Sequence, residues 1–136
     1  MEILNSSKRY KSDNKLIYSC QYHVIFCPKY RRPVLADKVG DRLKELVLEK
    51  QIEYKYEVLE MEVLPDHIHL LLEVNPRDGI YKIVQRIKGY TSHTLREEFP
   101  ELKKRLPSLW TKSKFISTVG AITLEVVKRY ISEQKR

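Results

Sequence analysis

The order of hydrophobic patterns along the chain predicts an α+β fold. Alternating apolar and polar residues indicate four strands, and helical spacing of apolar residues indicates a helix between the first and second and another between the third and fourth. This βαββαβ order predicts a ferredoxin-like (RRM-like) split antiparallel sheet, to which a short C-terminal helix is added. The 136 residues suit one domain, so we expect a flexible N-terminal lead-in over 1–14 and a single folded domain over 15–136.

The first half of the pattern predicts a strand, a helix and a hairpin. Residues 16–26 alternate as a strand does, and apolar residues then recur at helical spacing over 37–51, with Asp37 suited to be the N-cap. Residues 54–64 and 67–74 are rich in β-forming residues. They are separated by a Pro-Asp turn signal, so we expect them to form a hairpin.

The second half predicts a helix, a strand and the added helix. Amphipathic spacing extends over 78–99, and alternation over 110–119 predicts the fourth strand after a charged connection. The last helix is expected to begin at Thr123 and carries Tyr130 and Gln134. Both inner helices of such a fold cover one sheet face, so the other face is open to a partner or to the last helix.

The composition is strongly basic, with 26 Lys and Arg against 18 Asp and Glu and a net charge of +8. This favours a polyanionic partner or an anionic membrane surface. No apolar run approaches the roughly 20 residues needed to span a bilayer, and the N-terminus does not resemble a signal peptide, so we expect a cytoplasmic protein with no membrane association. Cys20 and Cys27 lack CxxC spacing and are expected to be reduced and structural.

His67 and His69 form the first candidate chemical group. They lie two positions apart on a predicted strand and therefore share one face, whereas Ile68 and Leu70 face the core. Two imidazoles on one face suit a metal ion, but they equally suit an exposed polar strand, and the spacing alone does not choose. Two histidines are too few for a closed structural site, which normally takes four ligands, so other groups would have to complete it.

Tyr130 and Gln134 form the second candidate group, because residues four apart share a helix face. Gln134 can add a neutral oxygen to two imidazoles and leave positions open for water or phosphate, as catalytic sites do. Tyr130 would then be a nucleophile for phosphorus, although a phenol of pKa about 10 needs help to ionise. The alternative for Tyr130 is an aromatic ring that only packs on the sheet.

Five ordered motifs resemble those of the TnpA-type transposases of small bacterial and archaeal insertion sequences, the single-tyrosine members of the HUH endonuclease superfamily. Two of them are Pro65-Asp66-His67-Ile68-His69 and Tyr130-Ile131-Ser132-Glu133-Gln134. The others lie at 22–32, 87–92 and 109–120, so the resemblance covers most of the chain. Lys114 departs from the pattern, since an aromatic residue is common beside Phe115.

The resemblance implies a DNA transposase that cleaves and rejoins single-stranded DNA at the ends of an insertion sequence. It implies that His67, His69 and Gln134 bind Mg²⁺ or Mn²⁺, and that Tyr130 forms a 5′-phosphotyrosine and frees a 3′-hydroxyl. Imperfect subterminal DNA hairpins would be recognised. Family members are homodimers in which the tyrosine helix of one subunit can complete the histidine site of the other.

Several basic residues are candidates for contacts with the DNA backbone, which position a nucleic acid without reading its sequence. They are Lys29, Arg31, Arg32, Lys82, Arg86, Lys88, Lys112 and Lys114. His23 is expected to be structural. Three other functions stay open: a non-catalytic RRM-like module for RNA or DNA, a hydrolytic metal enzyme, and a domesticated relative that processes chromosomal repeat hairpins. The chain lacks the RNP1 pattern of the RRM family, which counts against the first of these functions.

Overall fold

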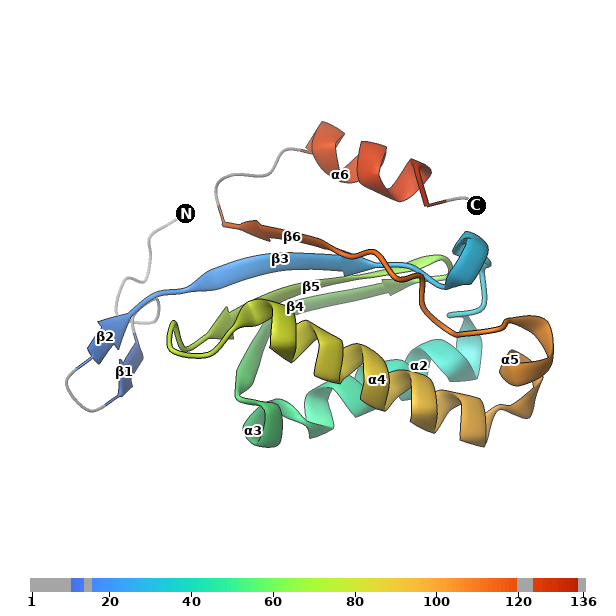
Figure 1. Ribbon diagram of the computed structural model, residues 1–136, viewed down its shortest axis with the longest axis horizontal. Coiled ribbons are helices and arrows are strands. Elements are labelled where there is room, and N and C mark those ends of the chain that lie inside the picture. The colour runs from blue at the N-terminus through green and yellow to red at the C-terminus, as the bar shows by residue number, and fades with distance from the viewer. Residues whose placement is uncertain (1–10, 14–15, 120–123, 135–136) are drawn as a thin grey trace.

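A four-stranded antiparallel sheet forms the centre of the protein, as a computed structural model that describes residues 11–13, 16–119 and 124–134 shows (Figure 1). Its strands lie in the order β4-β5-β3-β6. They are β3 (Gln21–Phe26), β4 (Tyr56–Leu64), β5 (His67–Val74) and β6 (Phe115–Thr118). In chain order these are the first to fourth strands of the βαββαβ unit, so the predicted ferredoxin-like fold class is confirmed.

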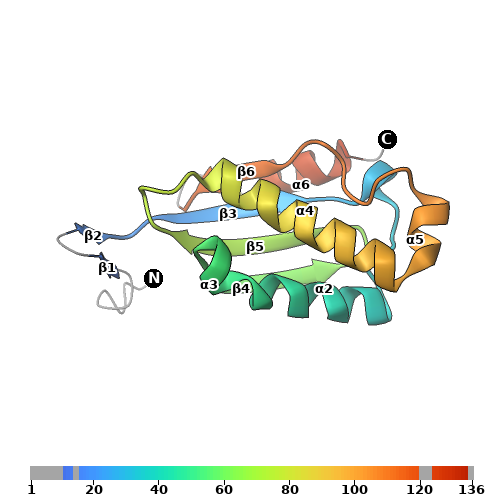
Figure 2. The ribbon, with the colours of Figure 1, turned by 60° about the horizontal axis from the view of Figure 1, so that its bottom comes forward.

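The helices lie on opposite sides of this sheet. α2 (Asp37–Glu49) and α4 (Ile80–Glu98) cover one face together. α6 (Leu124–Ser132) lies on the other side, as Figures 1 and 2 both show. Three short elements connect the larger ones: the 3₁₀ turn η1 (Lys29–Arg31), α3 (Gln51–Tyr54) and α5 (Pro100–Arg105). The final helix therefore occupies the face that the fold class leaves open.

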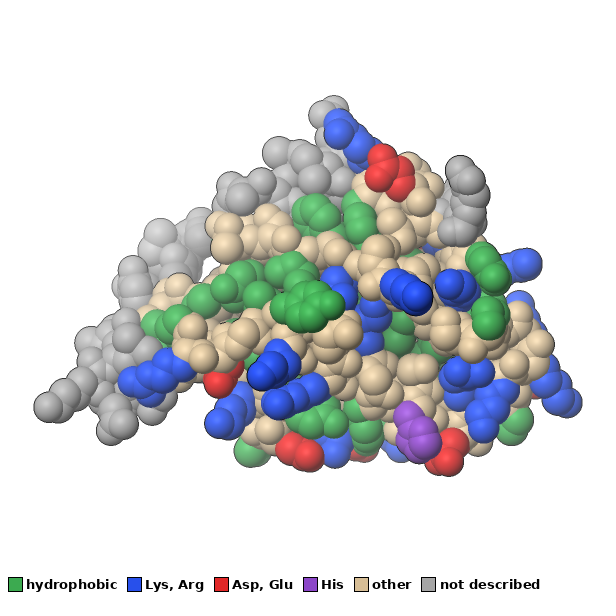
Figure 3. Space-filling view, in the orientation of Figure 1, with side chains coloured by type: hydrophobic (Ala, Val, Ile, Leu, Met, Phe, Trp, Pro, Cys, Tyr) green, Lys and Arg blue, Asp and Glu red, His purple; other side chains and the backbone are tan. Residues whose placement is uncertain are grey.

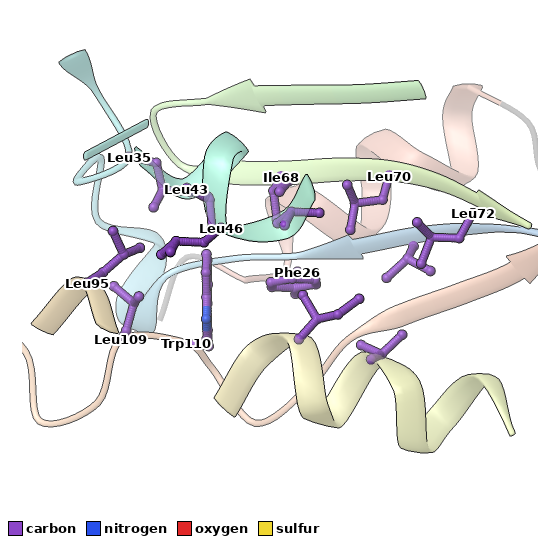
Figure 4. Packing of buried hydrophobic residues seen from close by; sticks show 14 of the residues in the cluster. Phe26, Leu35, Leu43, Leu46, Ile68, Leu70, Leu72, Leu95, Leu109 and Trp110 are labelled. Carbon is purple, nitrogen blue, oxygen red and sulfur yellow. The ribbon is translucent and has the colours of Figure 1, made fainter. Parts of the chain in front are cut away.

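The hydrophobic core fills the space between the sheet and the pair α2 and α4 (Figure 4). Every second residue of the central strands enters it, including Phe26, Ile68 and Leu70, all fully buried. Phe26 meets Trp110 edge to face, with ring centroids 4.7 Å apart. The Trp110 indole donates a 3.1 Å hydrogen bond to the Thr91 hydroxyl of α4. Burial of each such large apolar side chain contributes roughly 1.5–3 kcal/mol, so this layer holds the fold together.

The edge strand β4 contains a bulge. Val58 pairs with Leu72 and Glu60 pairs with Leu71, so Leu59 is an extra residue in the ladder. The extra residue changes the phase of the alternation. As a result Val58 packs against the core before the bulge and Met61 packs against it afterwards.

The predicted first strand is divided in the structure. β2 (Leu16–Tyr18) pairs with β1 (Lys11–Asp13), whereas β3 joins the central sheet. At the break the Cys20 amide donates to the Glu73 carboxylate at 2.6 Å, so a side chain replaces a ladder partner there. β1 lies within the range expected to be a flexible lead-in, and the rest of that range, 1–10 and 14, lies outside the described residues.

The helix boundaries also need correction. Asp37 is the first residue of α2 rather than its N-cap, with a left-handed φ of 53°, and the cap position Ala36 has no side-chain hydrogen bond. α5 lies within the charged connection, for which no helix was predicted; its first residue is a proline, whose missing N–H costs nothing in a first helical turn.

At the C-terminal half the fourth strand begins at 115 instead of 110, although Trp110 forms an isolated bridge with Pro28. The expected start of the last helix, Thr123, lies outside the described residues. Within the three described ranges, no helix combines the length and apolar character needed to cross a membrane.

Candidate active site

The two histidines of β5 lie on the sheet face that α2 and α4 leave uncovered. Ile68 and Leu70 alternate with them and are fully buried in the core, so the imidazoles must project to the opposite side. Across the ladder His69 stands opposite Glu62 of β4 and Ile25 of β3. The prediction that His67 and His69 share a face is confirmed by this register.

His67 contacts a carboxylate next to it in the chain. Its Nδ1 lies 2.9 Å from the Asp66 Oδ1 atom, and only 13% of the imidazole side chain is exposed. A ring nitrogen that donates to a carboxylate leaves the other ring nitrogen with a free lone pair. Such a carboxylate behind a histidine is typical of metal ligands, because it orients the ring and raises its basicity.

His69 contacts another histidine. Its Nε2 lies 3.1 Å from Nδ1 of His23 on β3, and the two ring centroids are 5.3 Å apart. Burial, with a further contribution from the nearby His23, lowers the pKa of His69 from its ordinary value, so the ring is neutral at neutral pH. A neutral imidazole is the form that binds metal ions.

The donor set fits a divalent ion in part. Two imidazoles on one face, with a carboxylate behind one of them, are suitable ligands. In the described parts of the chain no group of three or more His, Cys, Asp and Glu side chains is arranged to hold a metal ion. Amide oxygens such as that of Gln134 also suit divalent ions.

Tyr130 lies on α6 against the edge strand β6. Its ring centroid is 5.4 Å from that of Phe115, and its hydroxyl lies 3.5 Å from the Ser113 Oγ atom. Burial raises the pKa of Tyr130 to about 12, and the contact with Ser113 offsets part of this rise. The phenol is therefore protonated at neutral pH and needs a base or a cation nearby to react.

Gln134 follows α6 in a turn and lies beside the same serine. The Ser113 hydroxyl donates a 2.7 Å hydrogen bond to the Gln134 Oε1 atom. The structure thus brings Tyr130 and Gln134 together at Ser113. Among the described residues no hydrogen bond, ion pair or ring contact links either of them to His67 or His69.

Three residues of this region were not among the predicted site residues. Asp66 belongs to the predicted turn and to the first histidine motif but has no predicted role, although its place directly before His67 is a usable signal. Ser113 has no local signal, since its contacts come from residues 17 and 21 positions later. His23 was interpreted as structural, and its contact with His69 depends on the pairing of β3 with β5.

Most of the predicted DNA contacts are accessible. Figure 3 shows many Lys and Arg side chains and few acidic ones on one face of the molecule. Lys114 places its ammonium group 4.4 Å from the ring centroid of Tyr81, and Lys29 places its own 5.6 Å from that of Tyr30. Four further candidates are exposed: Arg32, Lys82, Arg86 and Lys112.

Lys88 does not lie where a DNA contact requires it. Only 8% of the residue is exposed, and its ammonium group donates to the carbonyl oxygens of Thr111 and Ser113 at 2.7 and 3.3 Å. Burial lowers its pKa to about 8. The expectation of a surface role is corrected: the α4 face that carries Lys88 turns inward, and the side chain supports the segment that contains Ser113.

Comparison with known sequences gives a consistent result. Residues 16–134 match the family model described as IS200-like transposase. The ISDra2 transposase TnpA of Deinococcus radiodurans is 36% identical over 126 residues, which cover 91% of this chain and 90% of that protein. The transposase for insertion sequence element IS200 of Salmonella typhimurium is 33% identical, with 87% and 81% covered.

Comparison with solved structures agrees. The crystal structure of a Deinococcus radiodurans protein assigned as a transposase superposes with a TM-score of 0.84 at 34% identity, covering 91% of this chain and 97% of that one. A REP-associated tyrosine transposase bound to a REP hairpin superposes with a TM-score of 0.58 at 14% identity, covering 89% of this chain and 67% of that one. The second likeness establishes the fold alone.

Proposed function

Because the chain belongs to the IS200-like transposases and is a DNA-processing enzyme, we propose that it cleaves and rejoins single-stranded DNA at the ends of an insertion sequence through a covalent bond to Tyr130. The observation that carries this proposal is the placement of α6, which lies on the uncovered side of the sheet, the side to which His67 and His69 project. Neither the two histidines nor Tyr130 belongs to the hydrophobic core.

Tyr130 is the proposed nucleophile. Its phenolic oxygen attacks the phosphorus of the scissile phosphodiester, the bond to the 3′ oxygen breaks, and the DNA remains attached as a 5′-phosphotyrosine. The phenol loses its proton, and the departing oxygen gains one and becomes a free 3′-hydroxyl. Because the phosphoester bond is retained, attack by a 3′-hydroxyl in the reverse direction rejoins strands without an external energy source.

His67, His69 and Gln134 are the proposed ligands of a divalent ion, Mg²⁺ or Mn²⁺. When bound, such an ion supplies electrostatic stabilisation of the charge that develops on the phosphate oxygens. In the structure the Gln134 oxygen accepts from Ser113. This oxygen has a second lone pair for the ion, and the proposed ligation requires Gln134 to lie beside the two histidines, in one chain or across a homodimer.

The DNA partner is proposed to contain imperfect hairpins. The chain's net charge of +8 and its exposed lysines and arginines suit the phosphate backbone. A protein of the same fold is bound to a REP hairpin in its own structure, which makes a hairpin a reasonable substrate to test. The stronger relatives are insertion-sequence transposases, so mobile-element ends are favoured over chromosomal repeats.

The central test is Tyr130→Phe with a single-stranded, hairpin-bearing DNA. We expect this variant to lose strand cleavage and the covalent protein–DNA adduct but to keep hairpin binding, because only the attacking oxygen is removed. The wild-type adduct should be seen by denaturing electrophoresis and assigned to Tyr130 by mass spectrometry. Cleavage by Tyr130→Phe at the wild-type rate would disprove the mechanism, and release of a free 5′-phosphate would indicate a hydrolase instead.

The metal is tested separately. His67→Ala should lose Mn²⁺- or Mg²⁺-dependent cleavage, and the free protein should bind Mn²⁺ less tightly in isothermal titration calorimetry. Full cleavage by the wild-type protein in excess EDTA would contradict the metal assignment. The homodimer is tested by light scattering, in which a monomer at micromolar concentration would count against it.

A further inference from the structure

Asp66 contacts two different side chains with its two carboxylate oxygens. Oδ1 lies 2.9 Å from Nδ1 of His67, and Oδ2 lies 3.1 Å from Nε of Arg31. The side chains of Arg31, Asp66 and His67 are only 19%, 29% and 13% exposed. A partly buried pair of opposite charges is screened less by water than a surface pair, and loss of one member leaves the other unpaired.

Arg31 also contacts α6. Its Nη1 donates a 2.9 Å hydrogen bond to the backbone carbonyl of Ile131, the residue directly after Tyr130. The same carbonyl also accepts a 3.1 Å hydrogen bond from the Gln134 amide, and a cation near the end of a helix interacts favourably with the helix dipole. A single guanidinium group therefore joins the carboxylate behind His67 to the end of the tyrosine helix.

The backbone of η1 aims Arg31 inward. Tyr30 and Arg31 both have left-handed backbone angles, with φ of 59° and 50°, which non-glycine residues seldom adopt. The loop is held in this form by hydrogen bonds from the Lys29 amide to the Leu109 carbonyl and from the Arg31 amide to the Pro28 carbonyl, both 2.8 Å. Its neighbour Arg32 is exposed to solvent. Such a conformation persists where the surroundings fix it, often at functional sites.

We propose that Arg31 and Asp66 form a brace that positions both halves of the active site, with Asp66 orienting His67 and Arg31 holding the end of the Tyr130 helix to the same carboxylate. The proposal rests on the proposed function, in which His67 is a metal ligand and Tyr130 the nucleophile. Both brace residues act through others and are positioning residues. Arg31, predicted as a contact for the DNA backbone, thereby has an internal role.

The first test measures Mn²⁺ binding to the free protein by titration calorimetry. Asp66→Asn should weaken Mn²⁺ binding by about 10- to 100-fold, the usual effect of removing a carboxylate behind a metal-binding histidine. Arg31→Gln should weaken it by less, under about 10-fold, because the carboxylate itself remains. Arg32→Gln removes the same charge from an exposed neighbouring position and should change Mn²⁺ affinity by less than about 2-fold.

The second test measures hydrogen exchange by mass spectrometry in peptides covering 124–134. Arg31→Gln should speed exchange there by about 10-fold or more, as expected for loss of a hydrogen bond from a charged group. Arg31→Lys should not restore protection, because one ammonium group cannot replace a planar guanidinium that donates in two directions. Exchange in β3 and β5 should stay as in the wild type, which shows that the sheet remains folded.

Unchanged Mn²⁺ affinity in Asp66→Asn, or unchanged exchange of the last helix in both Arg31 variants, would overturn the brace. If Arg31→Gln does not fold, Arg31→Lys gives the same comparison with the charge retained. Neither measurement depends on cleavage. If the Asp66 and Arg31 variants show both effects but the Tyr130→Phe variant still cleaves DNA, the brace is supported and the assignment of Tyr130 as the nucleophile is refuted. The two proposals therefore fail separately.

Discussion

The two faces of the central sheet are built from the same strands but differ in what they bury. On the face covered by α2 and α4, apolar residues such as Phe26, Ile68 and Leu70 form a continuous core. On the other face β5 carries His67 and His69, and α6 lies above it. The alternation of a strand thus lets one short sequence supply both stability and chemistry, and substitutions on the two faces should have different consequences.

The largest effect on stability is expected from the core face. Phe26→Ala should lower the free energy of unfolding by about 3–5 kcal/mol, because it removes a fully buried aromatic ring that packs on Trp110 and leaves a cavity. Urea denaturation followed by Trp fluorescence measures this change. A loss below about 1 kcal/mol would mean that the two faces do not divide stability and chemistry in this way.

The next effect concerns Lys88, a charged residue on the core side. Its pKa is lowered to about 8 from the ordinary value of 10.5, so the unfolded chain binds more protons than the folded one between these values. The stability of the wild type relative to Lys88→Met should therefore rise as the pH increases from 8 to 10.5. The pKa difference of about 2.5 corresponds to roughly 3 kcal/mol.

Denaturation of both proteins at several pH values measures this difference. Below pH 8 the relative stability should be flat, because Lys88 is then charged in both states. A constant difference from pH 7 to pH 10.5 would show that the ammonium group is not desolvated by the core.

A smaller effect is expected at Thr91, which is fully buried. Thr91→Val keeps the shape but leaves the buried Trp110 indole N–H without its partner, so we expect a loss of about 1–3 kcal/mol. Thr91→Ser, which keeps the hydroxyl group, is the matched control and should retain the hydrogen bond. Equal stability of Thr91→Val and the wild type, measured by urea denaturation, would contradict this contact.

The smallest effect on stability is expected on the other face. His69→Ala should change the free energy of unfolding by less than about 1 kcal/mol, because the half-buried imidazole lies outside the core and contacts mainly His23. The same variant should lose Mn²⁺-dependent cleavage. A loss of stability as large as that of Phe26→Ala would show that this face is part of the structural core.

The core face could be predicted well from sequence, because its signal is local. The alternation in β5 placed both histidines opposite Ile68 and Leu70, and the structure has the same boundaries for this strand, His67–Val74. The division of the first strand was missed, because it depends on the Cys20 amide pairing with a carboxylate 53 residues away. No local pattern contains that information.

The chemical face could be predicted only in part. Residue types and spacing identified His67, His69, Tyr130 and Gln134 as two groups. Two sets of contacts link residues that are distant in sequence. Ser113 contacts both Tyr130 and Gln134, and Arg31 contacts Asp66. The charge of Lys88 predicts a surface position, and no local pattern indicates the carbonyl groups of Thr111 and Ser113 that accept from it. Such placements follow from tertiary packing.

The bulge in β4 has a consequence for how the protein avoids unwanted association. β4 is an outer strand, and an open strand edge can recruit the edge of another molecule and seed aggregation. The extra residue Leu59 interrupts the regular ladder, and the strand carries the acidic residues Glu57, Glu60 and Glu62. A second β4 edge approaching it would meet like charges and an irregular backbone, so this edge resists self-association even in a crowded solution.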